Sequence, residues 1–527
     1  MSLIDILARG YFPKELPKPF VTEPFARAVT GTIALPADWG KSADSKPKIP
    51  TGKLERYSLA RGGLLRRPLS ICNPLHHFLL CKELYTNWPA VMAKANGTPL
   101  AATAPELKAV GRAIDGKHPQ AARSRLSQQN RLGKRFMLKT DISRFYHSIY
   151  THSIPWALHT KPVGKADRKL TLLGNRLDFW IRFGQDQQTI GIPIGPDTSL
   201  LIAELIMQRC DEELCARIPG LNGHRFIDDY ELTFLTRTAA EDAFHILEAC
   251  LSDFELALNP KKTEVQELPQ PFESPWVTAL RRIIIRPSRV GQESDLQIFF
   301  NVAFQLHKDF PGEAVLQFAL SRLRYVAVDN ANWNLFQRLV LNCVLPEPAC
   351  LPYALEQIIL RVNAGAVALR SEIEEIANLL ITSHAPLNHT SEVANALWAC
   401  LALRIPLNVD AVDAVSQCEN SVVALLALDV EENGLTNKPL DKTLWSTHMT
   451  QEALYDNHWL LAYEANIKGW LPSVRGADHV AADANFWHLK ANNVSFYDKR
   501  LATPPPAHPI VLPTLPTVSR FGSNLSP

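Results

Sequence analysis

Two adjacent aspartates, Asp228 and Asp229, are the feature that most restricts how this chain can fold. Apolar residues lead into them from Phe226, and an alternating run leads out from Tyr230 to Phe234. This pattern predicts a β-hairpin with the acidic pair at its turn, where short acidic side chains tolerate unusual backbone angles. An isolated Asp-Asp pair is most often a solvated turn, so the hairpin alone does not indicate a site.

A second strand supplies the partner that such a pair needs. The apolar segment from Phe136 to Thr140 predicts a strand that leads directly into Asp141. Adjacent carboxylates repel each other unless cations hold them, and magnesium prefers a shell of oxygen ligands. We therefore expect Asp141 and Asp228 to hold two Mg²⁺ ions, with Asp229 beside them.

The charge is distributed unevenly along the chain. The 527 residues carry a net charge of +2, but residues 51–150 contain 17 Lys and Arg against 5 Asp and Glu, a local excess of +12. A basic block together with an acidic metal centre is the electrostatic footprint of a polyanion partner. Nucleic acid is therefore expected to bind, and a merely solvated basic surface is the alternative.

The composition indicates an ordinary soluble protein, with 46% hydrophobic and 20% charged residues. The nine cysteines form no CxxC pair, which favours neither a disulfide framework nor a cysteine-based zinc module. A reducing, cytoplasmic location is expected. No stretch is long enough to span a bilayer and the start of the chain lacks a signal-peptide pattern, so no membrane partner is expected.

Changes in pattern divide the chain into four parts, 1–135, 136–300, 301–500 and 501–527. The first contains a proline-rich arm and a basic hairpin, and the second alternates strands with helices. The third shows helical stripes with little strand signal, including a long helix expected over Thr450–Trp470, and a HEAT-like solenoid of helix pairs would explain it. The fourth is rich in proline and predicts an extended tail.

Four segments resemble the motifs of reverse transcriptases, and they occur in the order of that superfamily. The strand before Asp141 resembles the first catalytic motif, and Gly191–Gly195 resembles the loop on the nucleotide side. Phe226–Asp229 resembles the Tyr-x-Asp-Asp hairpin, and Asn259–Thr263 resembles the lysine motif behind it. The resemblance implies an α+β fold with a right-hand-type palm (136–300) preceded by an arm and fingers (1–135).

Within that superfamily the chain resembles bacterial retron-like enzymes, especially the abortive-infection and other defence-associated reverse transcriptases. Phe226 replaces the hairpin tyrosine, and residues 140–154 are similar to those of the group. An all-α, HEAT-like domain stands where a conventional thumb would follow the palm. Ile194 replaces the glutamine of retroviral enzymes, which removes one nucleotide contact.

The resemblance implies roles for individual residues. Asp141, Asp228 and Asp229 are the expected catalytic residues, and the backbone oxygen of Ile142 is expected to join them in holding the metals. Tyr146 falls where these polymerases place the bulky side chain that excludes a ribose 2′-hydroxyl.

Four further residues are expected to bind the nucleotide. Arg67, with Arg66 beside it, would contact the triphosphate, although a plain exposed hairpin is an equally good reading of that stretch. Gly195 belongs to the loop on the nucleotide side. Lys262 would lie near the leaving pyrophosphate.

The expected function is a reverse-transcriptase-type DNA polymerase in antiphage defence, a homo-oligomer that uses dNTPs. Two modes are open: template-independent synthesis primed by a protein hydroxyl, or copying of a companion non-coding RNA into cDNA. Tyr11 is the candidate priming residue, and packing against Phe12 and Phe20 is its alternative role. Tyr146 disfavours an RNA-synthesising polymerase, and the retained aspartates disfavour a helical scaffold with a silent polymerase fold.

Overall fold

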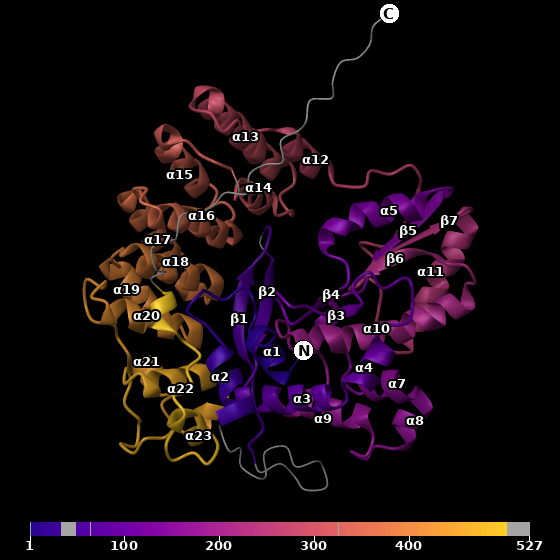
Figure 1. Ribbon diagram of the computed structural model, residues 1–527, viewed down its shortest axis with the longest axis horizontal. Coiled ribbons are helices and arrows are strands. Elements are labelled where there is room, and N and C mark those ends of the chain that lie inside the picture. Colours follow the sequence, from indigo (N-terminus) through magenta and orange to yellow (C-terminus); the bar gives the residue numbers. More distant parts are fainter. Residues whose placement is uncertain (1, 33–48, 64, 325, 503–527) are drawn as a thin grey trace, which may run out of the picture.

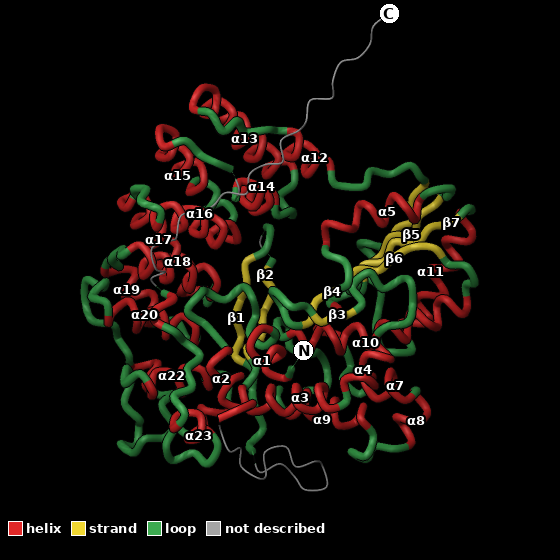
Figure 2. The backbone as a smooth tube through the Cα atoms, viewed as in Figure 1, coloured by secondary structure: helices red, strands yellow, loops and turns green. Residues whose placement is uncertain are grey.

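The computed structural model describes residues 2–32, 49–63, 65–324 and 326–502, so most of the expected proline-rich tail lies outside the described residues. Figure 1 shows the chain arranged in two halves that face each other. Strands β5 to β8 and their helices form one half, and a long arc of helices forms the other. The hairpin β1–β2 stands between them (Figure 2).

A four-stranded antiparallel sheet forms the centre of the expected palm. Its order is β6 (Asn222–Phe226), β7 (Asp229–Phe234), β5 (Phe136–Asp141) and β8 (Glu264–Glu267). The two-residue turn Ile227–Asp228 joins β6 to β7, so the predicted acidic hairpin is present. The order brings the hairpin beside the strand that ends at Asp141.

The two faces of this sheet are covered differently. On one face, Asp211 of helix α10 (Asp197–Arg217) accepts a hydrogen bond from the hydroxyl of Tyr230. Helix α11 (Arg237–Ser252) packs against α10 and against strands β5, β7 and β8. The next residue of β7, Glu231, points to the opposite face because side chains alternate along a strand. There it pairs with Arg131 of α5 (Arg123–Arg131). Helix α5 therefore lies on the face that carries Asp229.

The remaining elements before the helical arc form the arm, the fingers and the floor of the palm. The arm contains α1 and α2, and β1 pairs with β2 in the hairpin predicted from the sequence. The elements are α1 (Leu3–Arg9), α2 (Glu23–Arg27), β1 (Glu55–Ala60), β2 (Arg66–Ile71), α3 (Pro74–Thr86), α4 (Trp88–Ala95), β3 (Pro105–Leu107), β4 (Ile114–Gly116), α6 (Phe145–Ser148), α7 (Ser153–His159), α8 (Lys161–Ala166) and α9 (Leu173–Phe183).

After β8 the chain is mostly helical and curves as an arc from α12 to α23 (Figure 1). Apolar faces of successive helices pack on one another, with α17 against α18 and α18 against α20. The helices are α12 (Pro275–Arg282), α13 (Arg289–Asp309), α14 (Val315–Leu323), α15 (Trp333–Leu341), α16 (Leu351–Asn363), α17 (Arg370–His384), α18 (Thr390–Leu403), α19 (Val409–Ser416), α20 (Ser421–Glu432), α21 (Thr443–Ser446), α22 (Trp459–Ile467) and α23 (Phe486–Ala491).

Two sequence predictions about this arc need correction. The expected boundary after residue 300 falls inside α13, and the helices begin earlier, at Pro275. The long helix expected over Thr450–Trp470 is broken at Asp456. The Asp456 carboxylate accepts a hydrogen bond from the backbone N–H of His458 at 2.7 Å, which replaces the helical bonding pattern locally.

The fingers are fastened directly to the helical arc. The backbone N–H of Ser58 in β1 donates to the Thr390 hydroxyl at 2.6 Å, and that of Ala60 donates to the Ser391 hydroxyl at 2.9 Å. Both hydroxyls lie in the first turn of α18. The free edge of β1 is thus satisfied by side chains of a helix more than 300 residues later.

The arm is fastened to the far end of the arc. The N–H of Val21 donates to the carbonyl of Phe496 at 2.9 Å, and the N–H of Asp498 donates to the carbonyl of Pro19 at 2.8 Å. Phe20 and Tyr497 form an isolated antiparallel bridge between these bonds. Among the described residues, no helix has both the length and the apolar character needed to cross a bilayer.

Candidate active site

The sheet register sets the three aspartates side by side. Asp141, at the end of β5, pairs with Asp229, at the start of β7. The backbone N–H of Ile142 donates to the carbonyl of Asp228 at 3.2 Å, which ties the turn of the hairpin to the end of β5. The structure thus brings together all four residues expected to hold metal ions.

Asp141 is the most enclosed of these carboxylates, with 5% of the residue exposed. Its Oδ2 accepts a hydrogen bond from the ammonium of Lys262, and its Oδ1 is buried without a hydrogen-bond partner. A buried carboxylate oxygen without a partner is costly unless a cation neutralises it. The hydrogen bond to Asp141 also raises the pKa of Lys262, so this side chain stays charged.

Asp228 has an unusual electrostatic environment. Burial, followed by the negative charges of Asp229 and Asp141, raises its pKa to about 6. Groups of like charge raise each other's pKa because each disfavours ionisation of its neighbour. The cluster therefore stores a repulsion that a divalent cation would relieve.

The donors fit divalent metal ions such as Mg²⁺. They are hard oxygen atoms from carboxylates on two strands that meet at one end of a sheet, and one of them lacks any partner. Asp141, Asp228 and the backbone oxygen of Ile142 would hold the ions, with Asp229 next to them. The fit rests on these oxygens and on the raised pKa of Asp228.

The turn of the hairpin is itself strained. Ile227 has a φ of +57°, which is unfavourable for a β-branched residue. The sequence predicted that an acidic residue would tolerate the unusual angle, but the isoleucine adopts it. Its N–H donates to the Thr103 hydroxyl at 2.8 Å, and its carbonyl accepts from Arg225 at 2.7 Å. Such strain persists only where the surroundings hold it.

Arg225 anchors that support from inside the palm. It is fully buried and donates to Glu204 at 3.0 Å and to Asp211 at 2.7 Å. Burial acts to lower the pKa of Arg225, but the negative charges of Asp211 and Glu204 raise it well above its usual value. Arg225 is therefore charged inside the core. Tyr230 donates to the remaining oxygen of Asp211 at 2.7 Å. Sequence reasoning missed this network because its members come from separate elements.

Another cation contacts Asp229 from the face of the sheet on which α5 lies. Arg123, the first residue of α5, forms an ion pair with Asp229 at 3.1 Å, and its guanidinium lies 5.5 Å from the ring centre of Phe226. Phe226 occupies the position of the expected hairpin tyrosine, so Arg123 contacts both ends of the turn. Only the basic character of residues 51–150 hinted at such a residue.

Comparison with known proteins identifies this region. Residues 99–280 match the family model described as reverse transcriptase (RNA-dependent DNA polymerase). Residues 99–280 are a reverse transcriptase domain. The part of the chain that follows this domain is mostly helical.

Solved structures and curated proteins were also compared. The chain is similar to telomerase from Candida albicans, solved in complex with a TWJ fragment of telomeric RNA, at 11% identity and a TM-score of 0.27. The match covers 62% of this chain and 63% of that chain. No curated protein matches.

Tyr146, the residue expected to exclude a 2′-hydroxyl, lies in α6 of the reverse transcriptase domain. Burial raises the pKa of Tyr146, as do the negative charges of Glu204 and Asp228, while Arg67 acts in the opposite direction. Arg61 of the fingers lies close enough to Arg67 and Asp228 for both to affect its pKa, which burial lowers. The charges of Asp228 and Arg67 thus act on both Tyr146 and Arg61, and Arg61 was not expected.

The loop from Gly191 to Gly195 links the fingers to this domain. The N–H of Ile192 donates to the carbonyl of Tyr146 at 2.9 Å, and the N–H of Ser70 in β2 donates to the carbonyl of Ile194 at 2.7 Å. The loop thereby fixes the position of α6 relative to β2. These contacts join the strand that carries Arg67 to the helix that carries Tyr146.

Two expected nucleotide contacts have structural partners instead. Arg66 donates to both carboxylate oxygens of Glu392, at 2.6 and 2.7 Å, so it fastens the fingers to α18. Gly195 has a φ of +134°, and a Cβ there would lie 2.6 Å from Pro13. The glycine is required by the close approach of the arm. In this structure Arg66 is engaged by Glu392, and Gly195 packs against Pro13.

The candidate priming residue also needs correction. Tyr11 is fully buried, and its hydroxyl donates to the carbonyl of Cys72 at 2.5 Å. Its ring stacks on His77 with 4.2 Å between ring centres and contacts Phe12. The alternative role of packing is the one observed, although Phe20 contacts Tyr497 rather than Tyr11. In this conformation the hydroxyl cannot receive a nucleotide.

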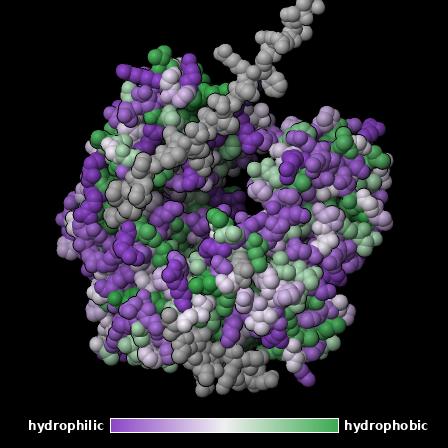
Figure 3. Space-filling model, viewed as in Figure 1, coloured by the Kyte–Doolittle hydropathy of each residue, from purple (hydrophilic) through white to green (hydrophobic). Residues whose placement is uncertain are grey.

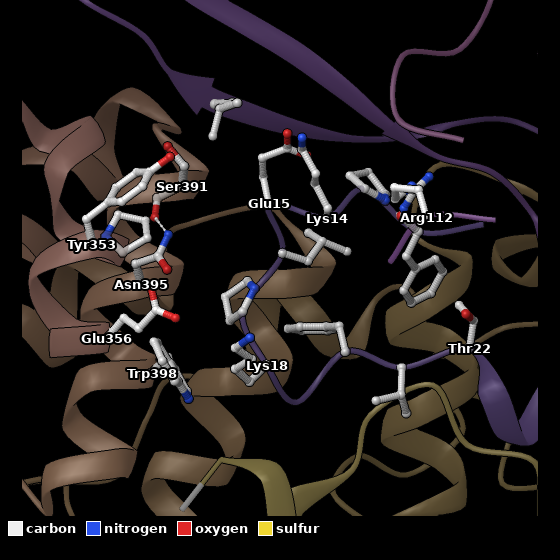
Figure 4. Close-up of a pocket in the computed structure, with 18 of the residues that line it drawn as sticks. Lys14, Glu15, Lys18, Thr22, Arg112, Tyr353, Glu356, Ser391, Asn395 and Trp398 are labelled. Carbon is white, nitrogen blue, oxygen red and sulfur yellow. Dashed lines mark hydrogen bonds between the residues drawn. The ribbon is translucent and has the colours of Figure 1, made fainter. Parts of the chain in front are cut away.

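Two hollows lie beside the enzyme core. The space-filling view shows a deep hollow between the helical arc and the reverse transcriptase domain (Figure 3). Separately, a cavity of about 780 Å³ lies between the arm and helices α16 and α18. Figure 4 shows Lys14 and Lys18 of the arm opposite Tyr353 and Trp398. None of the three aspartates lines this cavity.

Proposed function

We propose that this chain is a reverse-transcriptase-type DNA polymerase that acts in antiphage defence and transfers nucleotides at a two-metal centre. The observation that carries the catalytic part is the buried Oδ1 of Asp141, which has no partner and belongs to the same cluster as Asp228 and Asp229. A silent scaffold would have no need to retain such a destabilising arrangement. The defence role rests on the resemblance to defence-associated reverse transcriptases.

In this proposal the protein residues position the substrates and balance charge. Asp141, Asp228 and the carbonyl of Ile142 hold the ions. Two bound Mg²⁺ ions would lower the pKa of the attacking 3′-hydroxyl and stabilise charge on the leaving pyrophosphate. Lys262, which pairs with Asp141, exchanges that carboxylate for phosphate oxygens when a nucleotide enters.

The proposal assigns sugar selection to Tyr146 and triphosphate binding to Arg67 and Arg61. The hydrogen bond from the N–H of Ile192 to the carbonyl of Tyr146 fixes the backbone that carries this ring, and the ring fills the space that a 2′-hydroxyl would need. The charge of Asp228 acts on Arg61 and on Tyr146, and the charge of Arg67 acts on the same two residues, which supports placing both arginines near the nucleotide. Deoxyribonucleoside triphosphates are therefore the proposed substrates.

We infer that synthesis copies an RNA template rather than starting at Tyr11. The burial of Tyr11 removes the best local candidate for protein priming. The hollow between the two halves offers room for nucleic acid beside the basic N-terminal block. In the proposal the helical arc, a HEAT-like module in the place of a thumb, closes the far side of this space.

One experiment tests both the activity and the template. The purified chain is incubated with Mg²⁺ and labelled dNTPs, with and without an RNA template and DNA primer, and the RNA that copurifies with it is sequenced. Labelled DNA that depends on RNA supports the proposal. Activity equal to that of Asp141→Asn would overturn the polymerase, and label that stays on denatured protein would establish protein priming from a residue other than Tyr11.

A further inference from the structure

Two groups of metal-binding side chains lie in the helical arc, away from the aspartates. Each contains two histidines and one glutamate, with ligand atoms within 4.8 Å of one another. One group is His384, His389 and Glu392, and the other is Glu419, His448 and His458. Their surroundings differ in a way that decides which one can bind a metal.

The first group is already satisfied by the protein. Both carboxylate oxygens of Glu392 accept hydrogen bonds from Arg66. The Nδ1 atoms of His384 and His389 lie 3.0 Å apart and form a hydrogen bond with each other. A cation placed here would have to compete with a bidentate guanidinium for the same oxygens. This group is a structural ion pair.

Among the described residues, the carboxylate of the second group has ion pairs with its two histidines and none with an arginine. Glu419 Oε1 lies 3.3 Å from Nε2 of His448 and 3.6 Å from Nε2 of His458. The side-chain amide nitrogen of Asn457 lies 2.9 Å from the same nitrogen of His458. Because an amide nitrogen only donates, Nε2 of His458 accepts this hydrogen bond. Nε2 of His448 is buried and has no hydrogen-bond partner. The carboxylate thus meets ring nitrogens that do not donate to it.

The spacing of these donors matches a tetrahedral metal. Zinc binds histidine nitrogen and carboxylate oxygen at about 2.0–2.1 Å, which places two donors of a tetrahedral site roughly 3.3 Å apart. The observed separations of 3.3 and 3.6 Å are of this size. The two rings stack with 3.8 Å between centres and 24° between planes, so they turn apart when both Nε2 atoms bind one ion.

We propose that Glu419, His448 and His458 bind one transition-metal ion of the zinc class. Two imidazoles and one carboxylate are borderline donors that suit zinc better than magnesium. The Asn457 amide leaves Nε2 of His458 when the ion binds, and water, or the oxygen of that amide after rotation, completes the fourth position. The side chain of Glu419 is 53% exposed, which gives the ion an entry path from solvent.

The position of the site indicates a structural role. Glu419 directly precedes Asn420 and Ser421, whose side chains bind the carboxylate of Glu55 at the start of β1. His448 and His458 lie on either side of the short helix that contains Tyr455, and the carbonyl of Tyr455 accepts a hydrogen bond from the N–H of Lys53 at 2.9 Å. The ion would therefore connect the two segments that hold the beginning of β1.

The test measures zinc in the full-length, untagged protein. The protein is equilibrated with zinc in excess Mg²⁺, which saturates the oxygen-rich aspartate cluster, and then passed over a weak chelating resin. We expect one equivalent of zinc per chain by elemental analysis. Glu419→Gln changes an exposed side chain without changing its shape and should reduce affinity at least tenfold, as should His448→Gln. His389→Gln, in the other group, should retain the zinc.

A second measurement separates a real site from loosely bound zinc. Zinc should raise the melting temperature of the wild type and leave that of Glu419→Gln unchanged, because only a site formed in the folded state couples binding to stability. Cobalt in place of zinc should give the visible absorption of a tetrahedral complex. Zinc content below one-half equivalent, or equal retention by the wild type and Glu419→Gln, would overturn the proposal.

Discussion

The guanidinium of Arg225 donates a hydrogen bond to the carbonyl of Ile227, two residues further along the chain, at 2.7 Å. This bond carries an interaction from the buried core of the palm to the strained turn of the acidic hairpin. The carboxylates of Glu204 and Asp211 fix the same guanidinium from α10. The position of Asp228 is thus determined by a charge network that lies behind the active site.

Replacing Arg225 should destabilise the whole domain. Arg225→Met leaves Glu204 and Asp211 buried without a counter-charge, and removal of one partner from a buried network costs about 3–5 kcal/mol. Arg217→Met, which removes an exposed pair with Glu213, should cost less than about 1 kcal/mol. Urea unfolding of both variants measures the difference, and equal losses would contradict the importance of the network.

Replacing a carboxylate of the turn should remove activity and leave the fold intact. Asp228→Asn deletes a charged oxygen ligand, and we expect nucleotide incorporation to fall at least about 10³-fold through lost stabilisation of the transition state. The melting temperature should not fall, because the substitution relieves repulsion from Asp229 and Asp141. Incorporation of labelled dNTP near the wild-type rate would refute the metal assignment.

Shortening Tyr146 should admit ribonucleotides. Tyr146→Ala removes the ring proposed to occupy the space of a 2′-hydroxyl, so the preference for dCTP over CTP should fall by at least tenfold. Tyr146→Phe keeps the ring and should keep the preference. An unchanged ratio in an active Tyr146→Ala enzyme would show that another residue selects the sugar.

Replacement of Arg67 and replacement of Arg66, its neighbour in β2, should have different effects on activity and stability. Arg67→Ala should raise KM for dNTP because a positive charge near the triphosphate is lost, with little change in stability. Arg66→Ala removes the bidentate pair with Glu392 and should lower stability by about 3–5 kcal/mol, since that carboxylate is 2% exposed. Steady-state kinetics and thermal unfolding of both variants distinguish the two roles, and identical profiles would contradict the division.

The joint between β1 and α20 should weaken as pH rises. Burial raises the pKa of Glu55 to about 8, above the ordinary value near 4.5 that it has in the unfolded chain. The folded state therefore holds this proton more tightly, and its advantage is lost as pH rises between those values, by about 1.4 kcal/mol per unit.

Glu55→Gln provides the comparison, because it keeps the shape of the side chain and cannot ionise. The stability of the wild type relative to this variant should fall steadily from pH 6 to pH 8. A constant difference over this interval, measured by urea unfolding at each pH, would show that Glu55 keeps an ordinary pKa.

The acidic hairpin was predictable because its signal is local. Alternation, an acidic pair and a second strand ending in Asp141 are all visible within short windows of sequence. The support behind the hairpin was not predictable. Arg225, Glu204 and Asp211 meet only because β6 packs on α10.

Two residues, Arg66 and Tyr11, have roles that differ from those expected from the sequence, and the reason is the same for both. Arg66 and Tyr11 looked available because the sequence shows only their neighbours along the chain. Arg66 donates hydrogen bonds to Glu392, a residue 326 positions away, and the hydroxyl of Tyr11 donates to the carbonyl of Cys72. When a partner that is distant in sequence buries a charged or aromatic side chain, that contact decides the role of the residue.

The pairing of Val21 with Phe496 and of Pro19 with Asp498 sets an order for folding during synthesis. The arm leaves the ribosome first, yet its partners are made almost 500 residues later, so it must wait while the domain between them forms. Contacts of such sequence separation form late and slow the final step. A nascent chain would therefore expose Phe20 and its neighbours until residues 496–498 have been made, and a chaperone that binds apolar segments should associate with it during that interval.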